Sequence, residues 1–302
     1  MSTTNITNPN SSNSSSFVEY DQIILFGDSI TQGSCDQGSG GFAFCPALQH
    51  DYIRRFDIIN RGFSGYTSEQ ALAIFPCFFP PVQKARVRLM TVFFGANDAV
   101  LPGFQQHVPL NLYRENLIKI LTHPLIKAHP ETNLLLLTPP PVNEYQFSPS
   151  DTDTDTDTDT DTDTGAGADR DVDADVGTQP GALDPEPEPE PASPIMRKAS
   201  RTKQYADACR EVGKKLNVPV ADIWTAFMTV AGWVDGQPLA GSREVPVNER
   251  LQALLSDGLH FNPAGYRVLY DEVTRAIRTH YPHLAPENVP MHFPPWQSAP
   301  KS

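Results

Sequence analysis

Five short apolar runs alternate along the 302-residue chain with longer segments that have helical periodicity. Runs without polar positions in between are typical of strands that are buried on both faces. Strands that alternate with helices form a parallel sheet, because each helix crosses over the sheet and returns the chain in the same direction. We therefore expect an α/β fold with helices on both faces of one parallel sheet. The apolar runs lie at residues 23–26, 58–59, 87–94, 134–137 and 218–223.

The segments between these runs predict the helices. Residues 201–216 are a clear case, because their apolar residues recur at a spacing of three or four and so share one face. A last helix opens at Asn262-Pro263, where the proline fits the first turn, and runs to about His280. The other predicted helices lie at residues 42–56, 68–78 and 111–127.

We expect residues 21–283 to form a single domain, with a disordered leader at 1–20 and an irregular tail at 284–302. An acidic, proline-rich insert interrupts the domain at residues 147–194, with an alternating Asp-Thr repeat and a Pro-Glu repeat. It offers no apolar face to bury and its like charges repel, which predicts disorder. Its Asp-x-Asp spacing lacks the glycine and the terminal glutamate of a calcium-binding EF-hand loop, so no metal is expected there.

The net charge of −13 belongs to this insert. Twelve Asp, three Glu and one Arg in residues 151–191 carry −14, which leaves +1 for the rest of the chain. A nearly neutral domain gives no electrostatic reason to expect a nucleic-acid partner. No apolar run approaches the ~20 residues of a membrane span, and the leader lacks a secretory signal, so a cytoplasmic protein is expected. The four cysteines show no metal-ligand spacing and are expected to be free thiols.

Small and polar residues follow the apolar runs. Because the carboxyl ends of parallel strands meet at one edge of the sheet, we expect these residues to converge there. They are Gly27-Asp28-Ser29, the stretch at residues 60–68, Gly95-Ala96-Asn97-Asp98, Thr138, and the loop at residues 256–263.

Ser29 and His260 are the candidate nucleophile and base in this group. A serine hydroxyl is a weak nucleophile and needs a base within hydrogen-bond reach. His260 lies in a glycine-bearing loop just before a helix, and Asp257 three residues earlier can bond one ring nitrogen while the other faces Ser29. The local alternatives are a turn-capping Asp257, a solvated His260 and a Ser29 that only caps a helix. The other histidines are expected at the surface: His50, His107, His123, His129, His280, His283 and His292.

Acyl transfer also needs donors for the developing oxyanion. The candidates are the backbone N–H groups of Ser29 and Gly65 and the side-chain amide of Asn97. Their local alternatives are a turn glycine and an Asx-turn. Asp28 and Asp98 are expected to brace loops rather than to react. A small apolar pocket is predicted from Phe63, Tyr66 and Val100.

Four sequence blocks occur in the order that is found in the SGNH (GDSL-like) hydrolases, which this chain resembles. They are Phe26-Gly27-Asp28-Ser29, Gly62-Phe63-Ser64-Gly65, Gly95-Ala96-Asn97-Asp98 and Asp257-Gly258-Leu259-His260. Within that family the chain is most similar to the isoamyl acetate-hydrolysing esterases of fungi and plants. The stretches behind this similarity lie at residues 60–66, 93–99, 137–141 and 257–261, and the whole resemblance runs from Gln22 to His280 apart from the insert.

The resemblance implies a flavodoxin-like three-layer α/β/α sandwich with a parallel five-stranded sheet in the order 2-1-3-4-5. It further implies a Ser29–His260–Asp257 triad and an oxyanion hole from Ser29, Gly65 and Asn97. Ile30 follows the first block, so the chain reads Gly-Asp-Ser-Ile rather than Gly-Asp-Ser-Leu, an isosteric change that should leave the chemistry intact.

The predicted function is a serine carboxylic ester hydrolase that acts on short-chain, acetate-type esters through an acyl-enzyme, without a metal or cofactor. Its expected partner is a small-molecule ester. The same triad also serves acyltransferases, lysophospholipases and thioesterases, which remain alternatives. An alternative of another class is a non-catalytic binding protein whose acidic insert recruits partners. The presence of all four block residues counts against it.

Overall fold

The computed structural model describes residues 19–36, 41–147 and 195–299 of the chain. The predicted leader, apart from Glu19 and Tyr20, lies outside the described residues. The predicted insert, apart from Phe147, also lies outside them.

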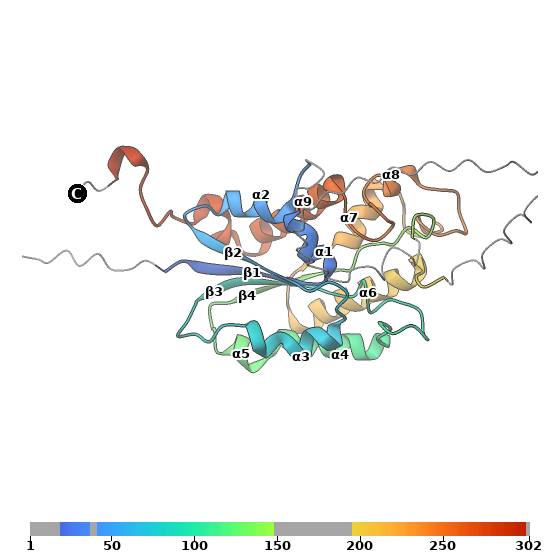
Figure 1. Cartoon of the computed structure of the whole chain (residues 1–302), viewed down its shortest axis with the longest axis horizontal. Helices are drawn as coiled ribbons and strands as arrows, with labels where there is room; N and C mark the ends of the chain where they lie inside the picture. The colour runs from blue at the N-terminus through green and yellow to red at the C-terminus, as the bar shows by residue number, and fades with distance from the viewer. Residues whose placement is uncertain (1–18, 37–40, 148–194, 300–302) are drawn as a thin grey trace, which may run out of the picture. The chain divides into compact units, whose positions relative to one another are not determined.

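Five strands form one parallel sheet in the order β2-β1-β3-β4-β5 within the described residues (Figure 1). This confirms the predicted fold class and strand order. At the carboxyl edge Gly27 pairs with Gly62 on one side and with Phe93 on the other, so three of the predicted site loops leave the sheet side by side. The strands are β1 (Asp21–Gly27), β2 (Phe56–Gly62), β3 (Val87–Phe93), β4 (Asn133–Leu137) and β5 (Val220–Ala221).

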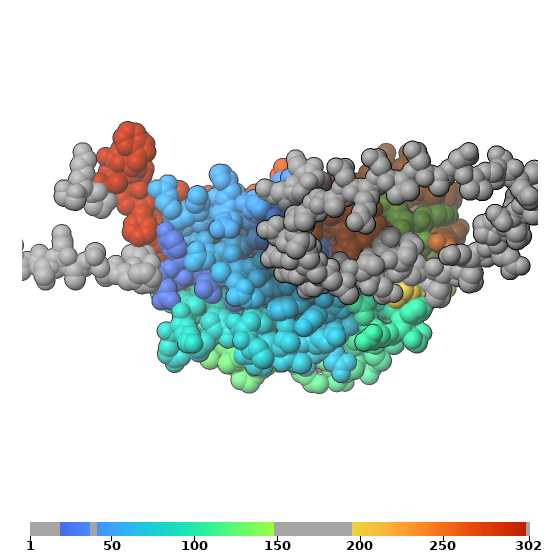
Figure 2. Space-filling view, viewed as in Figure 1, coloured from blue at the N-terminus to red at the C-terminus, as the bar shows by residue number. Residues whose placement is uncertain are grey.

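Helices cover both faces of the sheet. One layer holds α2 (Phe44–Asp51), α7 (Ile223–Val230) and α9 (Pro263–His280), and the other holds α3 (Ser68–Phe78), α4 (Leu110–Leu121) and α6 (Ala199–Leu216) (Figure 1). The space-filling view shows the side of α3 and α4, in cyan and green, as one continuous surface (Figure 2). The short helices are α1 (Ser29–Gln32), α5 (Pro124–Lys127) and α8 (Glu249–Gln252).

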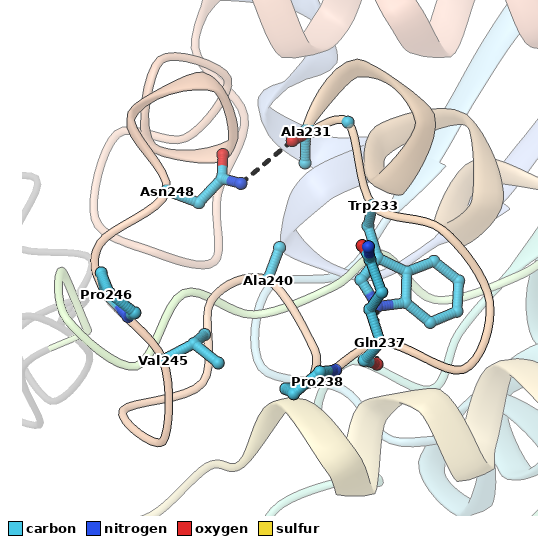
Figure 3. Close-up of a pocket in the computed structure, with 9 residues that line it drawn as sticks. Ala231, Trp233, Gln237, Pro238, Ala240, Val245, Pro246 and Asn248 are labelled. Atoms are coloured by element: carbon cyan, nitrogen blue, oxygen red, sulfur yellow. Dashed lines mark hydrogen bonds between the residues drawn. The ribbon is translucent and has the colours of Figure 1, made fainter.

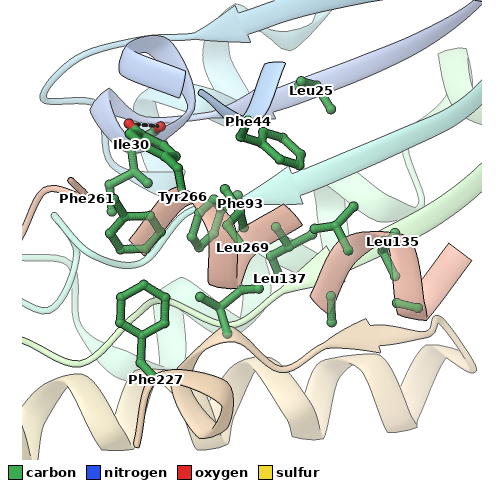
Figure 4. Close-up of a cluster of buried hydrophobic side chains, with 14 of the residues drawn as sticks. Leu25, Ile30, Phe44, Phe93, Leu135, Leu137, Phe227, Phe261, Tyr266 and Leu269 are labelled. Carbon is green, nitrogen blue, oxygen red and sulfur yellow. Dashed lines mark hydrogen bonds between the residues drawn. The ribbon is translucent and has the colours of Figure 1, made fainter. Parts of the chain in front are cut away.

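Each layer buries its own apolar cluster against the sheet. In the cluster under α7 and α9, Phe227, Phe261 and Leu269 pack towards Leu137 of β4 (Figure 4). The Tyr266 hydroxyl donates to the carbonyl oxygen of Ile30 over 2.9 Å, which ties α9 to the turn after β1 (Figure 4). The helix that follows the histidine loop is thus fixed to the helix that carries Ser29.

Three predicted elements differ from the structure. The helix predicted at residues 42–56 is shorter, since α2 ends at Asp51 and Phe56 already belongs to β2. The helix predicted at residues 111–127 is broken, because Pro124 restricts His123 to an extended conformation and α5 starts afresh. The strand predicted at residues 218–223 ends at Ala221, because the Asp222 side chain accepts the Thr225 N–H over 3.2 Å and caps α7. The apolar sequence of α7 reads equally well as the end of a buried strand.

The start of the predicted irregular tail packs on the domain. Leu284 is buried, and its carbonyl oxygen accepts the hydroxyl of the buried Tyr52 over 2.7 Å. The Arg55 side chain donates to the Val289 carbonyl oxygen over 2.9 Å. Among the described residues, no helix has the length and apolar character to cross a membrane.

Candidate active site

Ser29 stands at the carboxyl end of the buried strand β1, where it opens the short helix α1. The cap of that helix is Asp28, whose carboxylate accepts the Ile30 N–H over 3.0 Å. Ser29 is therefore not needed as a cap, and its Oγ lies 2.8 Å from Nε2 of His260. The two residues are brought together across 231 positions of sequence.

Asp257 holds His260 from the other side of the ring. One carboxylate oxygen accepts the backbone N–H groups of Leu259 and His260, over 2.8 and 2.7 Å. The second oxygen lies 2.5 Å from Nδ1 of His260. Asp257 thus caps the turn and also contacts the imidazole.

These contacts assign the protons. An ionised Asp257 can only accept, so Nδ1 of the neutral His260 ring carries the hydrogen and Nε2 is left as the acceptor. The Ser29 hydroxyl then donates to Nε2. A serine that donates to an imidazole, which in turn donates to a carboxylate, is the arrangement that activates a hydroxyl for nucleophilic attack.

The charges around the pair favour the ionised carboxylate. Burial acts to raise the pKa of Asp257, but the hydrogen bond and the charge of His260 outweigh it and hold that pKa well below its usual range. Burial likewise acts to lower the pKa of His260, but the bond and charge of Asp257 and the charge of Asp28 outweigh it and raise that pKa above its ordinary value. Arg197 opposes this rise with its own positive charge.

The raised pKa of His260 predicts the pH dependence of catalysis. His260 accepts a proton only when it is neutral, so kcat/KM should fall as the pH drops, with a midpoint above the usual pKa of a histidine. Initial rates on an activated acetate ester from about pH 5 to about pH 9 measure this midpoint. In Asp257→Asn, which removes the main group that raises the pKa, the residual activity should show a lower midpoint. A midpoint that is independent of Asp257 would contradict the assignment.

The loop after β2 brings Gly65 to the edge of the sheet. Gly62 has no side chain to clash there, since a Cβ would lie 2.0 Å from the backbone nitrogen of Gln32. Gly65 has φ of +74°, a conformation that glycine adopts without strain. Its carbonyl oxygen accepts Nε2 of Gln106 over 2.8 Å, and its N–H has no acceptor among the described residues. The N–H is therefore available to a ligand.

Asn97 follows β3 and is 3% exposed. Its Nδ2 donates to the carbonyl oxygen of Tyr66 over 3.0 Å, and its Oδ1 accepts Nη2 of Arg197 over 3.1 Å. The side chain therefore bridges two other segments instead of forming a local Asx-turn. One amide hydrogen of Nδ2 is left after the bond to Tyr66, and an oxyanion can accept it.

Asp98 and Asp28 brace the surrounding loops, as predicted. The fully buried Asp98 accepts the backbone N–H of Ser68 over 3.0 Å and also its hydroxyl, and Asn116 donates to Ser68 Oγ over 3.1 Å. This network fixes the start of α3 against the loop that carries Asn97. Burial raises the pKa of Asp98 to about 7 and that of Asp28 to about 6.

The predicted pocket residues fall into two groups. Phe63 and Tyr66 are half-buried, and their rings stack with centroids 5.3 Å apart. Val100 is fully buried, so its side chain does not line an open pocket in this conformation. Its carbonyl oxygen accepts a hydrogen bond from Nδ1 of His107 over 2.8 Å.

Among the buried polar residues that the sequence interpretation missed are Arg197 and His129. Arg197 lies just after the predicted insert, and nothing in its sequence context marks it as part of the site. His129 was expected at the surface, but it is buried and its Nε2 bonds to the Pro80 carbonyl oxygen over 2.9 Å. A lone histidine near the end of a helix has no sequence signal that separates these two environments.

A pocket formed by the segment between α7 and α8 offers no reactive group. It is a pocket of about 330 Å³, and Nδ2 of Asn248 donates to the Ala231 carbonyl oxygen across it over 3.0 Å (Figure 3). None of its lining residues is acidic, basic or a thiol. No group of three or more His, Cys, Asp or Glu suited to a metal ion occurs in the described ranges.

Comparison with known proteins places the chain among enzymes that act on esters. The model of the GDSL-like lipase/acylhydrolase family matches residues 25–268. A GDSL esterase/lipase of Arabidopsis thaliana is 31% identical over 90% of this chain and 91% of its own length. The isoamyl acetate-hydrolyzing esterase of Saccharomyces cerevisiae is 27% identical over 93% of this chain and 95% of its own length.

Solved structures share the fold at lower identity. A lipase/acylhydrolase from Enterococcus faecalis superposes with a TM-score of 0.50 at 22% identity, over 86% of this chain and 96% of that chain. An acetyl xylan esterase superposes with a TM-score of 0.52 at 16% identity, over 85% of this chain and 99% of that chain. The fold and the family define a carboxylic ester hydrolase of the SGNH type. The chain belongs to the GDSL-like lipase/acylhydrolase family.

Proposed function

We propose that the chain hydrolyses short-chain, acetate-type carboxylic esters with Ser29 as nucleophile, His260 as base and Asp257 as its orienting acid. One observation carries the assignment: Ser29 Oγ lies 2.8 Å from Nε2 of His260, whose Nδ1 lies 2.5 Å from Asp257. In the first half-reaction Ser29 Oγ attacks the ester carbonyl carbon while Nε2 takes its proton. The N–H groups of Ser29 and Gly65 and the Asn97 amide stabilise the resulting oxyanion.

The same residues complete the cycle. The protonated His260 gives its proton to the leaving alkoxide, so that the alcohol departs and the acyl group stays on Ser29. Water then donates a proton to Nε2 and attacks the acyl-enzyme, and His260 returns that proton to Ser29 as the acid leaves. Asp257 stays ionised throughout and stabilises the imidazolium, in keeping with its depressed pKa.

The preference for short acyl groups is supported by the loop after β2. The Phe63 N–H donates to the Gly27 carbonyl oxygen over 2.9 Å, which fixes this residue beside the strand that ends at Ser29. The Phe63 ring packs on Phe26, Tyr66 and Phe78 at centroid distances of 6.2, 5.3 and 5.8 Å, so it has little room to withdraw. A relative that is named for isoamyl acetate hydrolysis supports the same preference, and its similarity extends over nearly the whole chain.

An acyl-chain series tests this proposal. We expect kcat/KM to be highest for p-nitrophenyl acetate or butyrate and about tenfold or more lower for dodecanoate, because each methylene without room costs binding energy in the transition state. Phe63→Ala should move the optimum to longer chains. Ile74→Ala, which trims another half-buried residue of the same cluster, should lower stability but leave the optimum unchanged.

The alternatives give different results in the same assays. Rates that rise with chain length would indicate a lysophospholipase or lipase instead. A preference for an acetyl thioester over the matched oxygen ester would indicate a thioesterase. Formation of a new ester when an alcohol is added, faster than release of free acid, would indicate an acyltransferase.

A further inference from the structure

Arg197 carries a buried positive charge whose described hydrogen-bond acceptors are neutral. The residue is 5% exposed, and burial lowers the pKa of its guanidinium to about 10, so it stays protonated at neutral pH. Nη1 donates to the carbonyl oxygen of Ala96, and Nη2 donates to Oδ1 of Asn97 over 3.1 Å. Nε has no acceptor within the part of the chain that the structure describes.

Burying a guanidinium with only neutral acceptors carries a large free-energy cost, which a purely structural role does not explain. Removing an ion from water costs several kcal/mol, and neutral acceptors return less of that cost than a carboxylate does. The Phe147 ring lies 5.2 Å from the guanidinium carbon and holds it in place. The charges that act on Arg197 are those of Asp28, Asp257 and Asp98. Since Asp28 adjoins the nucleophile and Asp257 holds its base, the positive charge lies beside the reacting groups.

The bond to Oδ1 determines what Asn97 can donate. A guanidinium N–H can only donate, so it fixes Oδ1 towards Arg197 and Nδ2 towards the Tyr66 carbonyl and the site. A charged donor on the amide oxygen also draws electron density from the amide and makes the Nδ2 hydrogens more positive. Both effects strengthen the remaining N–H as a donor to a negatively charged oxygen.

We propose that Arg197 is a positioning residue of the oxyanion hole, which acts through the Asn97 amide to stabilise the transition state for ester hydrolysis. The inference rests on the proposed role of Asn97 as an oxyanion donor. It adds a positive charge to a site that otherwise contains neutral donors. Because the oxyanion forms only in the transition state, the loss of Arg197 should lower kcat and leave the binding of the ester unchanged.

Arg197→Met is the direct test, since methionine keeps much of the length and loses the charge. We expect kcat on p-nitrophenyl acetate to fall by about 10- to 100-fold with KM nearly unchanged. Asn97→Ala should lower kcat by about 100-fold or more, and adding Arg197→Met to it should cost less than about threefold, because the two residues act as one unit. The midpoint of the acid limb should move to higher pH in Arg197→Met, because the Arg197 charge lowers the His260 pKa.

Arg201→Met is the matched control. Arg201 is a half-buried arginine on α6 that donates to the Val100 carbonyl oxygen over 3.3 Å, and within the described residues it makes no hydrogen bond to Asn97. It should leave kcat and the acid midpoint unchanged. If Arg197→Met does not fold, Arg197→Lys takes its place, because lysine keeps the positive charge. Its kcat should fall by less than that of Asn97→Ala, again at constant KM. A KM effect without a kcat effect in either variant would overturn the inference.

The double variant Asn97→Ala/Arg197→Met separates the inference about Arg197 from the proposed role of Asn97 as an oxyanion donor. If Asn97→Ala loses activity and Arg197→Met lowers kcat by its full factor in that background, Arg197 does not act through Asn97 and the inference is wrong. If Asn97→Ala keeps full activity while Ser29→Ala does not, the oxyanion role of Asn97 is wrong and the inference falls with it. An unshifted acid midpoint in Arg197→Met also counts against the inference.

Discussion

Replacing Ser29 with alanine should lower kcat for p-nitrophenyl acetate by a factor of about 10⁴ to 10⁶, because the variant lacks the hydroxyl that is proposed to form the acyl-enzyme. The side-chain contact that is lost is the 2.8 Å bond to His260, at the edge of the sheet. Asp28 still caps α1, so the local backbone has no reason to change. Activity should therefore vanish while the midpoint of thermal unfolding stays within a few degrees.

Covalent labelling makes this prediction independent of the rate assay. A fluorophosphonate should add one adduct mass to the wild-type chain and none to Ser29→Ala, and peptide mapping should place the adduct on Ser29. Ser200→Ala is the control, since it removes an exposed serine of α6 and should keep both activity and label. Full activity in Ser29→Ala, or labelling of that variant, would rule out Ser29 as the nucleophile.

The sheet and its edge were predictable from the sequence because the evidence for them is local. An apolar run that stops at small polar residues predicts a strand end wherever it occurs, and parallel topology gathers those ends on one side. The helix predicted at residues 68–78 has the bounds that the structure shows for α3, since Thr67 and Gln70 form a capping box at its start. The bonds from Ser29 to His260 and from His260 to Asp257 are what this topology makes possible.

Other features were not predictable because they depend on contacts distant in sequence. Arg197 reaches Ala96 and Asn97 from about one hundred residues away, and its neighbours in sequence give no sign of burial. Val100 has the apolar character of a pocket residue, but its side chain in the loop after β3 is fully buried. A sequence pattern assigns residues to an edge of the sheet, and the packing of the loops decides which of them face a ligand.

Replacing His260 with glutamine should cost about as much activity as the loss of Ser29, again a factor of about 10⁴ to 10⁶ in kcat. Glutamine can still hydrogen-bond to Asp257 but cannot take a proton at neutral pH, so Ser29 stays unactivated. Fluorophosphonate labelling should slow by a comparable factor, because it uses the same activated hydroxyl. A variant that labels at the wild-type rate would show that Ser29 has another base.

Asp257→Asn is the graded comparison for His260→Gln, and the structure makes it a clean one. Asparagine keeps an acceptor oxygen for the N–H groups of Leu259 and His260, which are now bonded over 2.8 and 2.7 Å, so the turn should survive. It loses only the negative charge and the acceptor on Nδ1, which leaves the imidazole in the wrong tautomer. We expect a loss in kcat of about 10⁴, equal to or smaller than that of His260→Gln. If Asp257→Asn unfolds while Asp257→Glu is folded and inactive, the main role of the carboxylate is to stabilise the turn that carries His260. If Asp257→Asn is folded and fully active, the turn alone positions His260 and the charge of Asp257 has no part in catalysis.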